Sequence, residues 1–235
     1  MKILSLSLIF TSLIVISAIG CDQADSGLAA NDMVSDGAYA LDENLGAVQA
    51  ELGKIALEPV STEEAAGLLY MREEEKLAHD VYAAMFVKWN LRPFTNISRS
   101  EQMHMDAILS LITRYSLIDP VGTNGAGIFK DAALQNLYTT LMIQGNKTDV
   151  DALKVGATIE EVDIVDLQKH LKENDNKDIA LVYDNLMRGS RNHLRAFVKN
   201  LSARGIVYSP QFLSQTEYNA IIASGIERGY RGGRK

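Results

Sequence analysis

The sequence of 235 residues contains one cysteine, Cys21. A single cysteine excludes a disulfide framework within the chain and any zinc site built from several thiolates. Basic residues are also fewer than acidic ones, with 23 Lys and Arg against 30 Asp and Glu. Without its first twenty residues, of which only Lys2 is charged, the chain keeps 22 basic and 30 acidic residues, a net charge of −8. Such a protein is a poor candidate for non-specific nucleic-acid binding.

A long uncharged apolar run occurs at the start of the chain. Met1 and Lys2 are followed by residues 3–20, which are apolar except for Ser and Thr. A short basic start, an apolar core and small residues at the end are typical of a secretory signal peptide. The run is only marginally long enough to span a bilayer. We therefore expect residues 1–20 to be a signal peptide and the remainder to be exported.

Cys21 stands where the apolar run stops, in Ser17-Ala18-Ile19-Gly20-Cys21. This segment resembles the lipobox of bacterial lipoproteins, in which the cysteine becomes the lipidated first residue. The resemblance implies that Cys21 anchors the protein to a membrane, facing the periplasm or the exterior. It departs from the usual pattern at Ala18 and Ile19, where leucine and a small residue are common. A cleaved signal with a free thiol and a retained anchor helix are the alternatives.

The rest of the chain divides into three parts. Residues 21–58 are rich in Ala, Gly, Ser, Asn and Asp and predict a flexible tether, in which the weakly helical stretch 47–57 is able to dock on the domain. Residues 59–208 carry sustained helical patterns and predict the folded domain. Residues 209–235 predict a short helix and a basic tail. The chain shows no internal repeat at solenoid period.

Helix signals mark the folded domain. Ser61-Thr62-Glu63-Glu64 has the spacing of a capping box at a helix start, and Pro93 requires that the first helix end before it. Ser214 and Glu217 form a second candidate capping box. We expect long helices over about 61–89, 96–115, 148–173 and 178–201, with short helices over about 129–143 and 214–223. Because no segment predicts a strand, the expected fold is all-α, a four-helix bundle with a short extra helix in the crossover and another at the C-terminus.

Each long helix has a row of mostly apolar residues, its seam, which is expected to face the bundle interior, and polar residues interrupt each seam. Residues that recur at spacings of three and four face the bundle interior. These seams are apolar except for one group of polar residues in each helix: Glu75; Glu101 and His104; Glu160; Ser190 and His193. An unpaired carboxylate in an apolar interior is costly. A shared metal would satisfy all four seams, because carboxylates and imidazoles bind iron and manganese.

Two motifs strengthen this interpretation. Glu101-Gln102-Met103-His104 places a carboxylate and an imidazole on one helix face, as in di-iron carboxylate bundles. Glu75 and Tyr82 resemble the Glu-x6-Tyr pattern on the first helix of ferritin-like proteins. Together, residues 73–82, 100–105, 159–164 and 189–194 resemble a bacterial ferritin-like branch known as a domain of unknown function. The resemblance covers about residues 59–208 and implies a ferritin-like four-helix bundle.

The same resemblance implies a role for each interior residue. Glu75 would be the first-helix ligand, Glu101 would bridge two metals, and His104 would bind one of them. Glu160 would be the third-helix ligand and His193 the second histidine.

Ser190 departs from the ferritin-like pattern, which has a glutamate three residues before the second histidine. Asp163, one turn after Glu160, is a candidate replacement, and both one-metal and two-metal sites remain open. Glu74 and Glu161 compete with Glu75 and Glu160 as ligands.

Simpler structural roles compete with ligand roles. Glu101 has the spacing to cap the second helix together with Ser98, and His104 taken alone is compatible with an ordinary core histidine. His170 is expected to be exposed among Gln168, Lys169 and Lys172, with no role at the site.

The leading interpretation is an exported, membrane-anchored metal-binding protein holding one or two irons, with manganese as an alternative. Reduced iron would support chemistry with oxygen or peroxide. The sequence leaves open whether the protein is an enzyme, and it names no substrate. The alternatives are a surface lipoprotein that uses the bundle as an interaction scaffold, which Ser190 favours, and a metal buffer.

Overall fold

The computed structural model describes residues 45–228, which form seven helices and no strand. This confirms the all-α prediction. The expected signal peptide, Cys21 and the end of the basic tail lie outside the described residues. The helices are α1 (Leu45–Leu52), α2 (Thr62–Trp89), α3 (Arg92–Arg114), α4 (Ala132–Gly145), α5 (Asp149–Lys172), α6 (Lys177–Ser202) and α7 (Gln215–Ala223).

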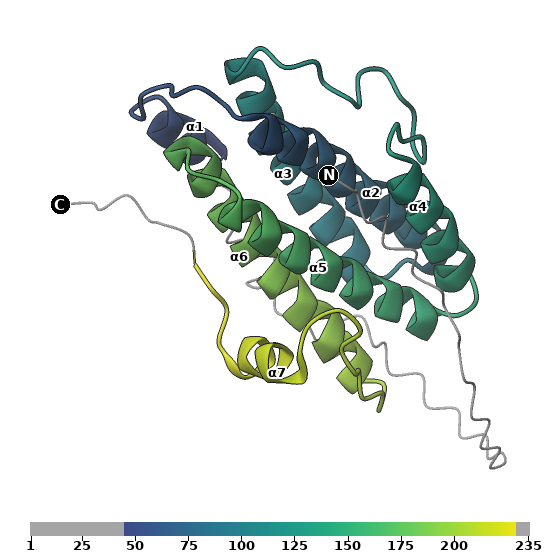
Figure 1. The fold of residues 1–235 in the computed structure, drawn as a ribbon. Coiled ribbons are helices and arrows are strands. Elements are labelled where there is room, and N and C mark those ends of the chain that lie inside the picture. Colours follow the sequence, from purple (N-terminus) through teal and green to yellow (C-terminus); the bar gives the residue numbers. More distant parts are fainter. Residues whose placement is uncertain (1–44, 229–235) are drawn as a thin grey trace, which may run out of the picture. The chain divides into compact units, whose positions relative to one another are not determined.

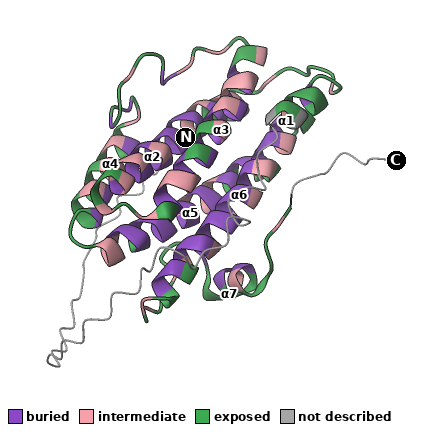
Figure 2. Ribbon diagram, turned by 180° about the vertical axis from the view of Figure 1, so that it is seen from behind, coloured by how far each residue is buried: buried purple, intermediate pink, exposed green. Residues whose placement is uncertain are grey.

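Four long helices, α2, α3, α5 and α6, lie side by side as a bundle (Figure 1). Short connections join α2 to α3 and α5 to α6, so each pair is antiparallel and packs extensively. Helix α4 lies in the crossover and packs on α2 and α5, while α7 packs on α6 and α1 on α3 and α6. Buried residues line the inward faces of the four long helices (Figure 2). The bundle interior is therefore the place where polar seam residues meet.

Helix α2 begins at the predicted capping box. The Ser61 hydroxyl accepts from the Glu64 N–H at 3.1 Å, and Glu64 Oε2 accepts from the Ser61 N–H at 2.8 Å. The other Glu64 oxygen accepts the N–H groups of Asp175 and Asn176, in the turn between α5 and α6. One buried carboxylate thus satisfies a helix start and ties it to the distant turn.

Helix α3 begins at Arg92, earlier than expected, because proline is tolerated in the first turn, where no N–H partner is needed. Pro93 occupies this first turn and Phe94 follows it fully buried. Glu101 therefore lies well inside the helix, and the interpretation of Ser98 and Glu101 as a helix cap is wrong.

Helix α7 has half of its expected capping box. Ser214 accepts from the Glu217 N–H at 3.2 Å. The Glu217 carboxylate accepts instead from Gln168 of α5, which fixes α7 to the bundle.

The crossover between α3 and α4 is held by three charged residues on one face of α2. Glu73 accepts the N–H groups of residues 130 and 131 at 2.6 and 3.0 Å. Lys76 donates to the Gly125 carbonyl, and Asp80 accepts the Gly127 N–H. These buried groups satisfy loop backbone atoms, so they serve the fold and leave the next helix face free for the interior site.

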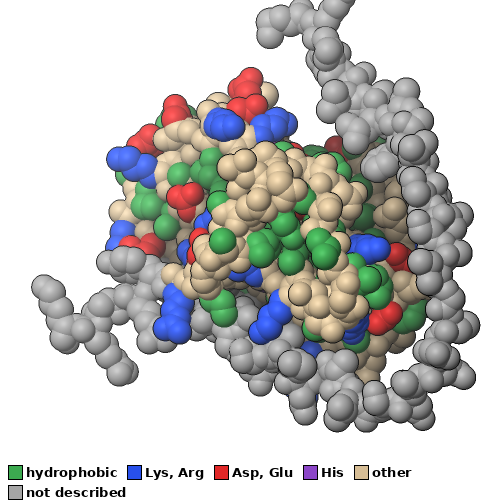
Figure 3. Space-filling model, turned by 90° about the horizontal axis from the view of Figure 1, so that it is seen from below, with side chains coloured by type: hydrophobic (Ala, Val, Ile, Leu, Met, Phe, Trp, Pro, Cys, Tyr) green, Lys and Arg blue, Asp and Glu red, His purple; other side chains and the backbone are tan. Residues whose placement is uncertain are grey.

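Hydrophobic side chains also occur on the surface. Val87 and Val207 are almost fully exposed. On the end of the molecule seen in Figure 3, hydrophobic side chains are interspersed with charged ones, as is normal for a protein surface. Across residues 45–228, no helix combines the length and the apolar character needed to cross a bilayer.

Candidate metal centre

Glu101 of α3 lies at the middle of the interior polar residues, with only 2% of its surface exposed. Its two carboxylate oxygens face different histidines. Oε2 lies 2.8 Å from His104 Nδ1, and Oε1 lies 2.9 Å from His193 Nδ1. A carboxylate that divides its oxygens in this way has the arrangement of a bridge between two subsites.

The first subsite combines α2 and α3. Glu75 Oε2 lies 3.2 Å from His104 Nδ1. Glu75, Glu101 and His104 each offer one ligand atom, and these atoms all lie within 4.8 Å of one another. The three side chains are buried, so a cation among them would be shielded from water.

The second subsite combines α3, α5 and α6. Glu160 Oε2 lies 3.4 Å from His193 Nδ1, and Glu101, Glu160 and His193 form a second buried group with ligand atoms within 4.8 Å. The rings of His104 and His193 stack with centroids 5.6 Å apart. The structure thus brings together all five residues that the sequence analysis singled out as ligands, in two groups that share Glu101.

Several atoms of these groups have no hydrogen-bond partner among the described residues. They include Glu75 Oε1, Glu101 Oε1 and His193 Nδ1. The last two atoms are close to each other, but their orientation does not make a hydrogen bond. Buried polar atoms that converge without bonding one another carry a large desolvation cost. Carboxylate oxygens and imidazole nitrogens are also ligands that iron, manganese and zinc accept, so this donor set fits a metal.

The electrostatics of the centre are strongly coupled. Burial raises the pKa of Glu75 and of Glu160 to about 7, although a neighbouring histidine partly offsets this effect in each. Burial also raises the pKa of Glu101, but His193 and His104 outweigh it and bring that pKa below the ordinary range.

Burial and neighbouring charges shift the pKa values of the two histidines in the opposite directions from those of the glutamates. Burial lowers the pKa of His104 and of His193, but the surrounding glutamates raise each pKa well above its ordinary value. The negative potential that favours protons on these imidazoles would equally favour a cation between the side chains.

Asp163 is a buried carboxylate beside the centre and contacts Ser190, although neither of the two ligand groups includes it. Asp163 lies on α5, and its Oδ2 and the Leu186 carbonyl both lie within hydrogen-bonding distance of the Ser190 hydroxyl, whose single proton they share. The other oxygen, Oδ1, has no partner among the described residues. Burial and the carboxylate of Glu75 raise the pKa of Asp163 well above its ordinary value. Ser190 therefore contacts a buried carboxylate of the neighbouring helix, next to the centre.

The two competing glutamates lie elsewhere. Glu161 accepts the N–H groups of Gln211, Phe212 and Leu213 and the Tyr208 hydroxyl, so it binds the turn after α6. Glu74 is buried beside the centre, but neither of the two ligand groups includes it.

His170 was expected on the surface but is buried. It packs against Gly67, where a Cβ would come within 2.8 Å of His170 Nδ1. The polar residues next to His170 in sequence predicted an exposed position. The sequence could not reveal its burial, because a glycine on another helix provides the space for the ring.

Of the two residues that orient the ligands, sequence reasoning missed Ser100 and singled out Tyr82 without its partner. Ser100 lies 3.0 Å from His193 Nε2, which leaves Nδ1 directed at the carboxylates. Tyr82, which the sequence analysis paired with Glu75 in the Glu-x6-Tyr pattern, donates to Glu160 Oε1 at 2.5 Å. No local signal reports such contacts, because each joins helices far apart in the sequence.

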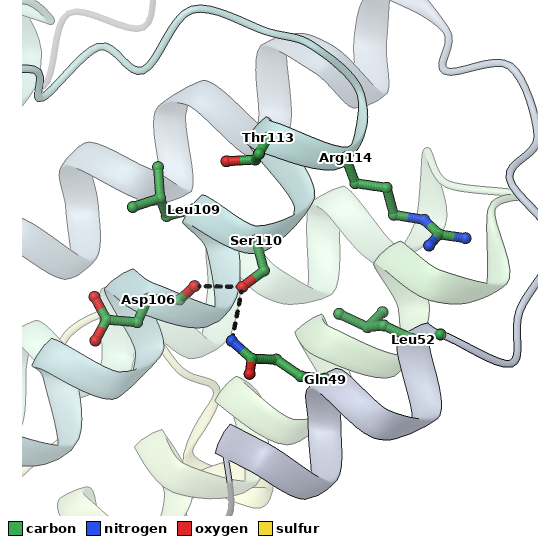
Figure 4. A pocket seen from close by; sticks show the side chains of 8 residues that line it. Gln49, Leu52, Asp106, Leu109, Ser110, Thr113 and Arg114 are labelled. Carbon is green, nitrogen blue, oxygen red and sulfur yellow. Dashed lines mark hydrogen bonds between the residues drawn. The ribbon is translucent and has the colours of Figure 1, made fainter.

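A separate open pocket of about 630 Å³ lies between α1 and α3. In Figure 4, Gln49 of α1 points to Ser110 of α3, to which it donates a hydrogen bond at 3.4 Å, while Leu52 of α1 and Arg114 of α3 lie on opposite sides of the pocket. None of its lining residues belongs to the two Glu/His groups.

Comparisons with known proteins assign the chain to a protein family. Residues 64–225 match the model of a family described as "Uncharacterized protein domain (DUF2202)". The chain belongs to the DUF2202 family. A relative is the uncharacterized protein MJ0754 of Methanocaldococcus jannaschii, which is 51% identical over 178 residues, or 76% of this chain and 96% of that protein. The crystal structure of MJ0754 is similar to this chain with a TM-score of 0.72, covering 74% of this chain and 99% of that one.

The DUF2202 match includes all five Glu and His residues of the centre as well as Asp163 and Ser190. It ends before the basic tail and begins after α1. The DUF2202 domain is thus the helical bundle itself, and the interior centre is contained within it.

Proposed function

We propose that this DUF2202 domain is a ferritin-like metal-binding protein with iron held between α2, α3, α5 and α6. The observation that carries the proposal is the pair of buried Glu/His groups that share Glu101. Four separate helices each contribute to them. A bundle stabilised by apolar packing alone has no need of such a set, because each buried ionisable group costs free energy.

Each residue has a distinct part in the proposed centre. Glu75 and His104 would hold one metal, Glu160 and His193 would hold a second, and Glu101 would offer one oxygen to each. Asp163 is the additional carboxylate available to the centre, oriented by Ser190. Ser100 holds the far nitrogen of His193, and Tyr82 holds one oxygen of Glu160. Such outer contacts fix ligand orientation and tautomer.

The bundle would also exclude water from the centre. Tyr82, Phe94 and Phe197 are fully buried and pack ring to ring, with centroids 5.3 to 6.1 Å apart. Bound iron would supply one-electron redox chemistry toward oxygen or peroxide. In this proposal the protein provides fixed ligands and a dry environment for that chemistry.

We further propose that the protein is exported and anchored to a membrane through a lipid on Cys21. The support for this proposal is the basic and apolar start of the sequence and the place of its one cysteine. Incorporation of labelled palmitate in wild-type but not in Cys21→Ser cells would be the expected result, and equal labelling would contradict it.

The test of the metal proposal is an anaerobic titration of the full chain with Fe(II), beside a Glu101→Ala/His193→Ala variant. Two irons per chain, lost in the variant, are expected. Iron should also raise the melting temperature of the wild type alone, because a ligand that binds only the native state stabilises it. Failure of both iron and manganese to bind above the variant would sink the proposal and favour the interaction-scaffold alternative. Reversible release of iron without turnover of oxygen or peroxide would identify a metal buffer.

A further inference from the structure

A second group of buried carboxylates lies next to the proposed metal centre, along the seam between α2 and α5. These helices run antiparallel, as two contacts show: the Tyr70 hydroxyl donates to Asp166 at 3.0 Å, and the Tyr82 hydroxyl reaches the Gly156 carbonyl at 3.3 Å. Glu74 lies one turn after Tyr70, and Asp163 lies one turn before Asp166. Glu74 is therefore level with Asp163 in the seam.

Glu74 belongs to neither ligand group, and among the described residues its strongest electrostatic interaction is with the carboxylate of Asp166. It is 3% exposed, and both of its carboxylate oxygens are buried without a partner among the described residues. Burial raises the pKa of Glu74, and the carboxylates of Asp166, Asp163 and Glu75 raise it further. Glu74 thus faces acidic groups on both sides and contributes nothing visible to the stability of the bundle.

The three carboxylates also lack a basic partner. Within residues 45–228, Asp163, Glu74 and Asp166 form no ion pair with Lys or Arg. Their hydrogen bonds come from the hydroxyls of Ser190 and Tyr70. An acidic group of this kind is neutralised either by protons, as the raised pKa of Glu74 indicates, or by a bound cation, for which the buried Glu74 oxygens would be ligand atoms.

The group connects the surface to the centre. Asp166 and Tyr70 are partly exposed, whereas Glu74, which interacts electrostatically with both, and Asp163, which interacts with Glu75, are buried. Asp131, at the start of α4, adds negative charge near Tyr70, because its carboxylate contributes to raising the pKa of that phenol. Acidic groups at the outer end of such a path raise the local concentration of cations.

We propose that Asp166, Glu74 and Asp163 form the path by which a divalent cation reaches the metal centre, with Glu74 as the intermediate ligand. This inference rests on the proposed function, since it needs a metal centre to supply. A cation would exchange water for the oxygens of Asp166, then of Glu74 and Asp163, and finally for those of Glu75 and Glu101. Each carboxylate would hold it briefly, because no three of these oxygens converge closely enough for a tight site.

The test is the rate at which Co(II) fills the centre of the full chain, followed by stopped-flow absorbance of its visible bands. Co(II) serves as the probe because it accepts the same nitrogen and oxygen ligands as Fe(II). In Glu74→Gln, which keeps side-chain volume, we expect loading to slow on the order of tenfold, with the final stoichiometry unchanged. Asp166→Asn should slow loading by a smaller factor and weaken its dependence on salt.

Asp184→Asn is the matched control, because it removes an exposed carboxylate from α6 and should load at the wild-type rate. Melting temperatures of all variants check that each is folded. Glu74→Gln protein that is folded and loads as fast as the wild type would overturn the path. A wild-type chain that binds no Co(II) would instead refute the metal centre itself, so the two failures are distinguishable.

Discussion

At the scale of single residues, Ser190 and Asp163 are linked across two helices. The ferritin-like resemblance of the sequence implies a glutamate where this chain has Ser190, and a serine is a weak metal ligand. Asp163 of α5 is buried next to Ser190 and contacts its hydroxyl. In the proposed centre, Asp163 would supply the carboxylate that position 190 lacks.

Two variants test this relationship. In the proposed centre, Asp163→Asn should weaken metal binding by about 100-fold, because it removes a buried carboxylate oxygen next to both ligand groups. Ser190→Ala should weaken metal binding by about tenfold through loss of orientation alone. Isothermal titration under anaerobic conditions measures both effects.

Ser110→Ala provides the control, since Ser110 makes the same bond to the carbonyl four residues earlier but lies outside the centre. Equal affinity in Ser190→Ala and Ser110→Ala would contradict the assigned role of Ser190.

At the scale of helices, close packing of α5 on α6 brings Glu160 and His193 together. Gly156 allows this approach. A Cβ there would lie 2.4 to 2.7 Å from the ring of Phe197, which is fully buried between Tyr82 and Phe94 and has no space to move. Glycine is thus required at position 156 for the two helices to pack this closely, although glycine inside a helix is unfavourable on its own.

Gly156→Ala should therefore destabilise the protein by about 1–3 kcal/mol, despite the better helix propensity of alanine, because the extra methyl group overpacks the core. Urea unfolding measures this change. Gly125→Ala is the control, because nothing lies within 4 Å of a Cβ at that loop position. A Gly156→Ala protein as stable as the control would show that α5 and α6 tolerate a wider spacing.

The start of α2 is tied to the turn between α5 and α6 by Glu64. Burial raises the pKa of Glu64, but hydrogen bonds from Ser61, Asp175 and Asn176 outweigh burial and lower it to about 2. A lowered folded-state pKa contributes stability that is present above the unfolded value of about 4.5 and is lost as pH falls toward 2.

Glu64→Gln should accordingly reduce the free energy of unfolding at pH 7 by about 2 kcal/mol. The difference between wild type and variant should shrink as pH falls from 4.5 to 2, because protonated glutamate also loses the charge-assisted bonds. Urea unfolding at several pH values tests this, and a difference that does not vary with pH would contradict the assignment.

At the scale of the whole molecule, much of the architecture was predictable from the sequence. Helical periodicity and the Ser61–Glu64 capping box located the bundle, and seam positions placed Glu75, Glu101 and Glu160 in its interior. These features are local and repeat within each helix. The structure agrees because four seams must share one interior.

Contacts between helices were not predictable in the same way. Burial of His170 depends on Gly67 of another helix, and the use of Glu161 by the turn at residues 211–213 depends on how the chain returns to α5. The loop-binding role of Glu73, Lys76 and Asp80 likewise needs the path of the crossover. Each of these pairings is set by tertiary packing, which a single sequence does not encode locally.

The most direct test of the account is a crystal structure of the iron-loaded protein with anomalous diffraction measured on both sides of the iron absorption edge. The account predicts two anomalous peaks bridged by Glu101, one beside Glu75 and His104 and one beside Glu160 and His193. Iron-loaded crystals with no anomalous peak between these side chains, or with peaks only at the protein surface, would contradict the central claim.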